Sequence, residues 1–250
     1  IIATPLRPSG AVLWTLQLIL LSIFPLLLLF IWVKFVEKRK IRTLGLVRDN
    51  FLTKFLVGFG IGFLLFTLVT LLMYITGVID LNQSISTEIN FLPGILVVLP
   101  GWILQSSTEE IISRGWLMHI IGARYKPIVG FIVSSILFGL LHITNPGVNF
   151  ISILNIVLVG LLLGLYVIYT QDLWGVCGLH AAWNFTQGNI YGFSVSGLEG
   201  YSNSLVTFTS KGSDLMTGGQ FGPEASIFST IVLGLGIIIL IKMVFDKNYS

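Results

Sequence analysis

The sequence contains little charge and almost no cysteine. Asp, Glu, Lys and Arg make up 10% of its 250 residues, whereas hydrophobic residues make up 54% and the mean hydropathy is +0.93. Because a soluble domain usually carries about 25% charged residues, this composition indicates a polytopic membrane protein. The single cysteine, Cys177, excludes an intrachain disulfide and a metal site built from several cysteines.

Other familiar signals are missing as well. The chain has no H-E-x-x-H motif of zinc peptidases and no G-x-S-x-G motif of serine hydrolases. It has no internal repeat, which argues against a transporter, and no polar linker divides it. We therefore expect one transmembrane domain over residues 1–250, with its motif-bearing core at about residues 93–191.

Seven apolar stretches are long enough to cross a bilayer, which takes about 20 residues at a rise of about 1.5 Å per residue. They lie at residues 11–33, 52–78, 93–122, 127–145, 149–170, 173–191 and 225–243. The first is too long for a signal peptide and is expected to remain as a span. The predicted fold class is all-α, a polytopic transmembrane helical bundle of seven spans, or eight with a re-entrant segment.

The distribution of charge predicts the orientation. Half of the fourteen Lys and Arg residues lie in the loop after the first span: Lys34, Lys38, Arg39, Lys40, Arg42, Arg48 and Lys54. By the positive-inside tendency this loop is cytoplasmic, which places the N-terminus outside and the C-terminus in the cytoplasm. The second loop, with Asp80 and Glu88, and the loop 192–224 then lie outside. The latter is expected either to cap the bundle or to be a plain tether, and Glu224 suits a helix start.

Ionisable side chains lie within the predicted spans, where each costs about 3 kcal/mol or more. Glu110 and Arg114 are four residues apart and are expected to pair on one helix face, while Glu109 points elsewhere. His180 and Asn184 share this spacing, as do Phe138 and His142, so that the Phe138 ring is expected to pack beside the imidazole. Counting residues along three of the predicted spans places these polar groups at overlapping depths in the membrane.

Such a group of side chains favours hydrolysis. A carboxylate with an imidazole can activate a water molecule, and a histidine with an asparagine can stabilise an oxyanion. Alternatively, Glu109, His142 and His180 could hold a zinc ion. A plainer interpretation is that each residue only forms structural contacts between helices. We apply it to His119, and to Gln105 and Ser106, which we expect to form helix–helix hydrogen bonds.

The ordered motifs resemble the CAAX-protease and bacteriocin-processing family of intramembrane proteases, also called the Abi family. EExxxR stands at residues 109–114, FxxxH at 138–142 and HxxxN at 180–184. The glycine-rich segment 218–223 is also similar to bacterial members. The resemblance implies a helical bundle in which Glu109 and His142 activate water and His180 and Asn184 stabilise the oxyanion.

In that resemblance Glu110 and Arg114 support the site, and no metal is required, although zinc is an alternative. The implied substrates are membrane-associated peptides or proteins, such as a leader peptide, a pheromone, a bacteriocin or a lipid-anchored tail. The size and loops indicate a bacterial plasma-membrane protein in contact with lipid and not with nucleic acid. Two other functions stay open at this point: a catalytically silent immunity or scaffold protein, and a proton-coupled transporter.

Overall fold

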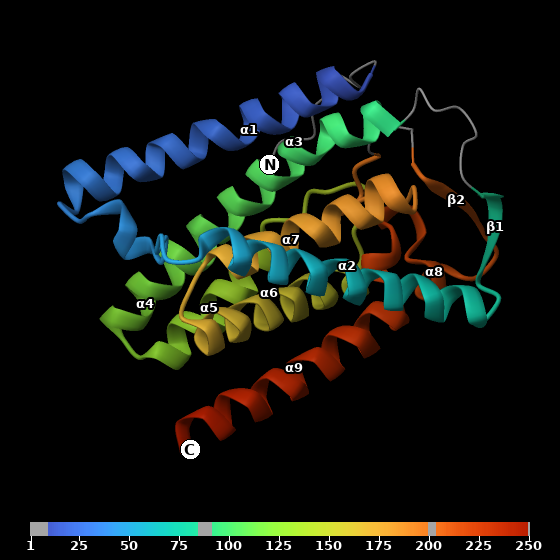
Figure 1. The fold of residues 1–250 in the computed structure, drawn as a ribbon. Coiled ribbons are helices and arrows are strands. Elements are labelled where there is room, and N and C mark those ends of the chain that lie inside the picture. Colours follow the sequence, from blue (N-terminus) through green and yellow to red (C-terminus); the bar gives the residue numbers. More distant parts are fainter. Residues whose placement is uncertain (1–9, 85–91, 200–203, 250) are drawn as a thin grey trace.

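Long apolar helices dominate the computed structural model, which describes residues 10–84, 92–199 and 204–249. The α-helices are α1 (Ala11–Ile31), α2 (Phe51–Ile75), α3 (Leu92–Glu110), α4 (Met118–Arg124), α5 (Pro127–Leu140), α6 (Phe150–Thr170), α7 (Trp174–Phe185), α8 (Asp214–Thr217) and α9 (Ile227–Tyr249). Figure 1 shows α7 within the bundle and α1 and α9 at opposite edges of it. The predicted all-α bundle is confirmed.

Wider or tighter helical turns extend several of these helices. The π-helical turn Trp32–Val36 continues α1, Ile111–Leu117 joins α3 to α4, and Thr186–Ile190 continues α7. Tighter 3₁₀ turns are short and lie at Ile41–Leu44, Gly219–Phe221 and Pro223–Ala225. Since π-helical turns often occur at functional sites, the turns that follow Glu110 and Asn184 indicate a functional site near these two residues.

Five helical stretches are long and apolar enough to cross a membrane. They are Ala11–Val36, Phe51–Ile75, Pro93–Arg124, Phe150–Thr170 and Ile227–Lys247. The other two predicted spans, residues 127–145 and 173–191, correspond to shorter helices. All seven predicted stretches are largely helical, and these two of them form helices shorter than predicted.

Each of the two short helices has its own physical reason. Helix α5 ends at Leu140 and continues as hydrogen-bonded turns to Asn145, because the residue before Pro146 disfavours helical backbone. Helix α7 is an interior helix: every residue of Gly175–Phe185 is buried, and α7 packs against α2, α3 and α6. A helix enclosed by others presents no face to lipid and does not need the full length of a span.

Small residues allow α2 and α7 to lie in close contact. A Cβ atom added to Gly62 would come within 2.1 Å of the Leu179 carbonyl oxygen, and one added to Gly178 within 2.1 Å of the Phe55 oxygen. Glycines therefore let the two backbones approach directly, as small residues do between membrane helices. Since Leu179 precedes His180, this contact also fixes the depth of that histidine.

The C-terminal loop folds back onto the bundle. Strand β2 (Val206–Ser210) pairs antiparallel with β1 (Ile79–Ser84), and Lys211 forms an ion pair with Asp80. The Phe221 side chain is fully buried in a cluster with Phe138 of α5 and Ile156 of α6. The loop is thus a cap and not a plain tether, whereas Glu88 of the predicted acidic loop lies outside the described residues.

Candidate active site

The adjacent carboxylates Glu109 and Glu110 end helix α3, where the helix widens into the π-helical turn Ile111–Leu117. The Nη1 atom of Arg114 donates to Oε1 of Glu110 at 2.9 Å, and both side chains are completely buried. The pair predicted from the four-residue spacing is therefore present. Glu109 is directed elsewhere and keeps 17% of its side-chain surface exposed.

Arg114 also ties together the helices that surround it. Its Nη2 atom donates to the carbonyl oxygen of Gly160 on α6 at 3.2 Å. The guanidinium group stacks over the Phe138 ring of α5, 4.2 Å from its centre. A buried charge is tolerated only when it is paired and hydrogen-bonded, and these contacts meet that requirement. Arg114 thus links α3, α5 and α6 beside the two carboxylates.

His180 lies between the two glutamates. Its Nδ1 atom donates to Oε1 of Glu110 at 2.8 Å, and its Nε2 atom lies 3.8 Å from Oε2 of Glu109. The ring is buried, so both nitrogens face carboxylates in a region shielded from solvent. This arrangement stabilises a doubly protonated ring, which can donate a hydrogen bond from Nε2.

The side-chain amide of Gln105 connects Glu109 to Asn184 by two hydrogen bonds. Gln105 donates to Oε1 of Glu109 at 2.6 Å and accepts from Nδ2 of Asn184 at 3.1 Å. Asn184 also donates to the hydroxyl of Ser106 at 3.2 Å. The expected helix–helix hydrogen bonds of Gln105 and Ser106 are therefore present. Gln105 does more than join helices, because it also orients the carboxylate of Glu109.

His142 lies in the turn that follows α5. Its Nδ1 atom donates to the Phe138 carbonyl oxygen at 2.8 Å, which leaves Nε2 as the acceptor when the ring is neutral. The predicted packing of Phe138 on this ring is present, with ring centres 5.2 Å apart. Phe138 also meets the His180 ring edge-on at 5.9 Å, so one aromatic side chain separates the two imidazoles.

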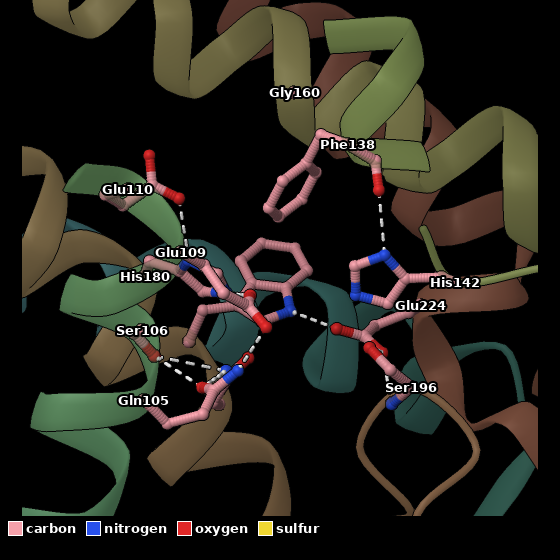
Figure 2. A network of polar contacts seen from close by, with 12 residues as sticks. Gln105, Ser106, Glu109, Glu110, Phe138, His142, Gly160, His180, Ser196 and Glu224 are labelled. Carbon is pink, nitrogen blue, oxygen red and sulfur yellow. Dashed lines mark hydrogen bonds and ion pairs between the residues drawn. The ribbon is translucent and has the colours of Figure 1, made fainter. Parts of the chain in front are cut away.

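The predicted residues thus form two sides of one site. Figure 2 shows Glu109, Glu110 and His180 on one side and His142 on the other. Within the described residues, no hydrogen bond joins Glu109 directly to His142. His119 lies apart from both histidines and donates from Nδ1 to the Arg114 carbonyl oxygen at 2.7 Å, within the π-helical region.

A third carboxylate, Glu224, reaches the site from the C-terminal loop. It lies near His142 in Figure 2 and interacts electrostatically with it. Burial raises the pKa of the Glu224 carboxyl, and hydrogen bonds from Ser196 counteract this rise. The sequence predicted only a helix start for Glu224. Its position after a glycine-rich segment in a capping loop was the one available signal.

The alternative zinc site requires three ligands arranged around one point. Among the described residues, no group of three or more His, Cys, Asp or Glu side chains could hold a metal ion. Glu109, His142 and His180 accordingly do not form such a group here.

The comparison with known families agrees with the motifs. Residues 90–186 match the family model described as Rce1-like, type II CAAX prenyl endopeptidase Rce1-like. This range contains all three motifs, so the predicted resemblance to this kind of protease is confirmed. No curated protein and no solved structure matches the chain. The family match supports a multi-pass membrane protease.

Proposed function

We propose that the chain is an intramembrane endopeptidase whose site consists of Glu109, His142, His180 and Asn184. The observation that carries this proposal is the position of the His180 ring between the carboxylates of Glu110 and Glu109, at 2.8 and 3.8 Å. Glu110 alone already binds Nδ1 of this ring at hydrogen-bond distance. Here a second, partly exposed carboxylate remains next to the ring.

Glu109 is the group best suited to activate water. One of its oxygens is held by Gln105, while the other faces His180 at a distance beyond a hydrogen bond. A water molecule bound there donates a proton to Glu109, with His142 as a second acceptor through its free Nε2 atom. The water oxygen then attacks the carbonyl carbon of the substrate. This is general-base catalysis, which contributes about 10²- to 10⁴-fold in rate.

The negative charge that develops on the carbonyl oxygen requires donors. The Nε2–H group of a protonated His180 supplies one, because Glu110 and Arg114 hold its ring in place. Asn184 supplies a second when its amide exchanges a bond to Gln105 or Ser106 for the oxyanion. The C–N bond then breaks, and the proton held by Glu109 passes to the leaving amine.

The reaction as written needs no metal ion, and we keep that as part of the proposal. Its test is the metal content of purified, active protein together with the effect of a chelator. Cleavage that persists in metal-free protein supports it. Loss of cleavage on chelation, with recovery after zinc is added back, contradicts it.

The family description names CAAX prenyl endopeptidases, and for this chain we propose the broader class of membrane-associated peptides or lipid-anchored tails. We also propose a bacterial plasma membrane, with the basic loop after α1 in the cytoplasm. The exposed basic side chains in this loop fit that side of the membrane: Lys34, Lys38, Lys40, Arg42 and Arg48.

The experiment that tests the function is proteolysis by the purified protein in liposomes. A set of membrane-anchored peptides is incubated with the wild type, E109Q and H142Q. The proposal expects cleavage by the wild type and a loss of about 100-fold or more in E109Q. Equal cleavage by all three proteins would show that another site or a contaminant acts. No cleavage by any of them would favour the scaffold interpretation.

A further inference from the structure

The C-terminal loop carries a carboxylate that none of the three family motifs contains. Glu224 lies in the short 3₁₀ turn Pro223–Ala225, just before α9 begins at Ile227. Its side chain is buried, with 4% of the residue exposed, although nothing about a helix start requires burial. A buried carboxylate is costly unless its oxygens are satisfied, so its partners indicate its role.

Donors hold both oxygens of this carboxylate. The indole Nε1 of Trp183 donates to Oε1 at 3.2 Å, and the backbone N–H of Ser196 donates to Oε2 at 2.6 Å. The Ser196 hydroxyl adds a second bond to Oε2 at 2.9 Å. Burial raises the pKa of the Glu224 carboxyl, and these hydrogen bonds oppose the rise because they favour the ionised form. Trp183 stands directly before Asn184, so this contact joins Glu224 to the catalytic face of α7.

The same loop is joined to the turn that carries His142. Asn145 donates from Nδ2 to the Ser196 carbonyl oxygen at 2.8 Å, while its own N–H bonds to the His142 carbonyl oxygen at 3.0 Å. Ser196 thus contacts Asn145 with its carbonyl and Glu224 with its N–H and hydroxyl. One residue therefore sets the position of the His142 turn relative to the carboxylate.

Glycines make this close contact possible. A Cβ atom on Gly197 would lie 2.1 Å from the Pro146 carbonyl oxygen. Gly222 has φ of 101°, and a Cβ atom there would lie 2.2 Å from the Ser194 carbonyl oxygen. A side chain at Gly197 would separate the loop from the turn that follows His142, and one at Gly222 would separate the residues before Glu224 from Ser194. The two glycines therefore keep the loop segments around Glu224 close to each other and to this turn.

We infer that Glu224 is a positioning residue for His142, held by Ser196 and Trp183, and that it supports the reaction through that imidazole. The backbone carbonyl of Phe138 binds Nδ1 of His142, and Glu224 supplies the negative charge near the ring. This charge strengthens the Nε2 atom of His142 as a hydrogen-bond acceptor for the water molecule whose proton passes to Glu109. The catalytic part of the inference rests on the proposed function, whereas the contact itself does not.

The contact can be tested without an activity assay, because the chain has three histidines, His119, His142 and His180. Their ring nitrogens are observed by NMR in ¹⁵N-histidine-labelled protein in nanodiscs and are assigned by single substitutions. In E224Q the His142 signal is expected to move and the His119 signal to stay. E37Q is the matched control, since it removes a carboxylate that binds Trp32 and Trp116 instead. An unchanged His142 signal in folded E224Q overturns the inference.

A second measurement applies if E224Q does not fold. In the wild type, solid-state NMR should show transfer between the Glu224 carboxyl carbon and a ring nitrogen of His142, within about 6 Å. Absence of this transfer, with transfer between Glu110 and His180 visible as a reference, overturns the inference.

Activity measurements distinguish a role of Glu224 in positioning His142 from a role in folding. In E224Q we expect kcat to fall about 10- to 100-fold, with KM little changed and the melting temperature close to that of S196A. S196A removes the hydroxyl bond to Oε2 but keeps the backbone N–H bond and the charge, so its loss of kcat should be clearly smaller than that of E224Q. Equal losses of kcat in the two variants would show that Glu224 only holds the loop in place, which contradicts the inference. If the wild type cleaves nothing, the proposed function fails while the NMR result still decides the contact.

Discussion

The Nδ1 atom of His180 lies 2.8 Å from Glu110 Oε1, the same oxygen that accepts a hydrogen bond from Arg114 at 2.9 Å. One buried carboxylate therefore neutralises a guanidinium group on its own helix and orients an imidazole on another. Glu109 meets the same ring more loosely, with its Oε2 atom 3.8 Å from Nε2 of His180. The two adjacent glutamates consequently have different tasks, and substitutions should separate them.

Removing the charge of Glu110 should damage the fold. E110Q leaves Arg114 buried without its counter-ion, which costs about 3–5 kcal/mol in the free energy of unfolding. E109Q should unfold close to the wild type, because a glutamine can still accept from Gln105. Denaturant unfolding in detergent measures both. Equal losses of stability would contradict the division of tasks between them.

The contact between α2 and α7 should not tolerate a methyl group. G62A places a Cβ atom 2.1 Å from the Leu179 oxygen, so α2 must move away from the helix that carries His180. We expect a loss of about 1–3 kcal/mol and a lower rate of cleavage. The control is G60A on the same helix, since a Cβ atom there meets nothing within 4 Å. G60A should be neutral or stabilising by up to about 1 kcal/mol, because alanine favours helix.

Asn184 should contribute to the rate more than its helix–helix contacts suggest. N184A removes a donor from the oxyanion, so kcat should fall about 10²- to 10³-fold. S106A removes one of the bonds of Asn184 but leaves its amide in place, and its kcat should stay within about 10-fold of the wild type. Similar kcat values for N184A and S106A in a cleavage assay would show that Asn184 is only structural.

The stability contributed by the Glu37 carboxylate, which lies after the end of α1, should decrease in acid. Burial alone would raise the pKa of the Glu37 carboxyl, but hydrogen bonds from Trp116, Arg39 and Trp32 outweigh it, and the pKa is lowered. A lowered pKa stabilises the fold above the usual glutamate range, near about 4.3, and this contribution disappears as the pH falls through the folded-state value.

Melting of the wild type and E37Q at several pH values measures this effect. The wild type should be the more stable protein at pH 7, and its advantage should shrink on acidification. An advantage that stays constant down to the lowest pH would show that the charge of Glu37 does not contribute.

The helices and the pairings within each motif could be predicted from the sequence, because hydropathy and four-residue spacing are local properties. The Glu110–Arg114 pair and the Phe138–His142 contact follow from spacing alone. The predicted span 127–145 already ended before Pro146, but hydropathy did not indicate that α5 ends at Leu140 and continues as turns. The interior position of α7 could not be predicted, since an apolar helix has the same hydrophobic pattern whether it faces lipid or protein.

The role of Glu224 could not be predicted either. It depends on a loop that returns to the bundle through contacts between residues far apart in the chain, such as Asn145 with Ser196. Likewise, the sequence could not show that Glu110, and not Glu109, binds Nδ1 of His180, because this contact depends on how α3 and α7 pack against each other.

Binding and cleavage of one membrane-anchored peptide by wild-type and E109Q protein, in the same liposomes, show whether Glu109 is the general base. We expect E109Q to bind the peptide with nearly the wild-type affinity and to cleave it at least about 100-fold more slowly, because Glu109 takes the proton from water. Cleavage by folded E109Q at the wild-type rate would contradict it.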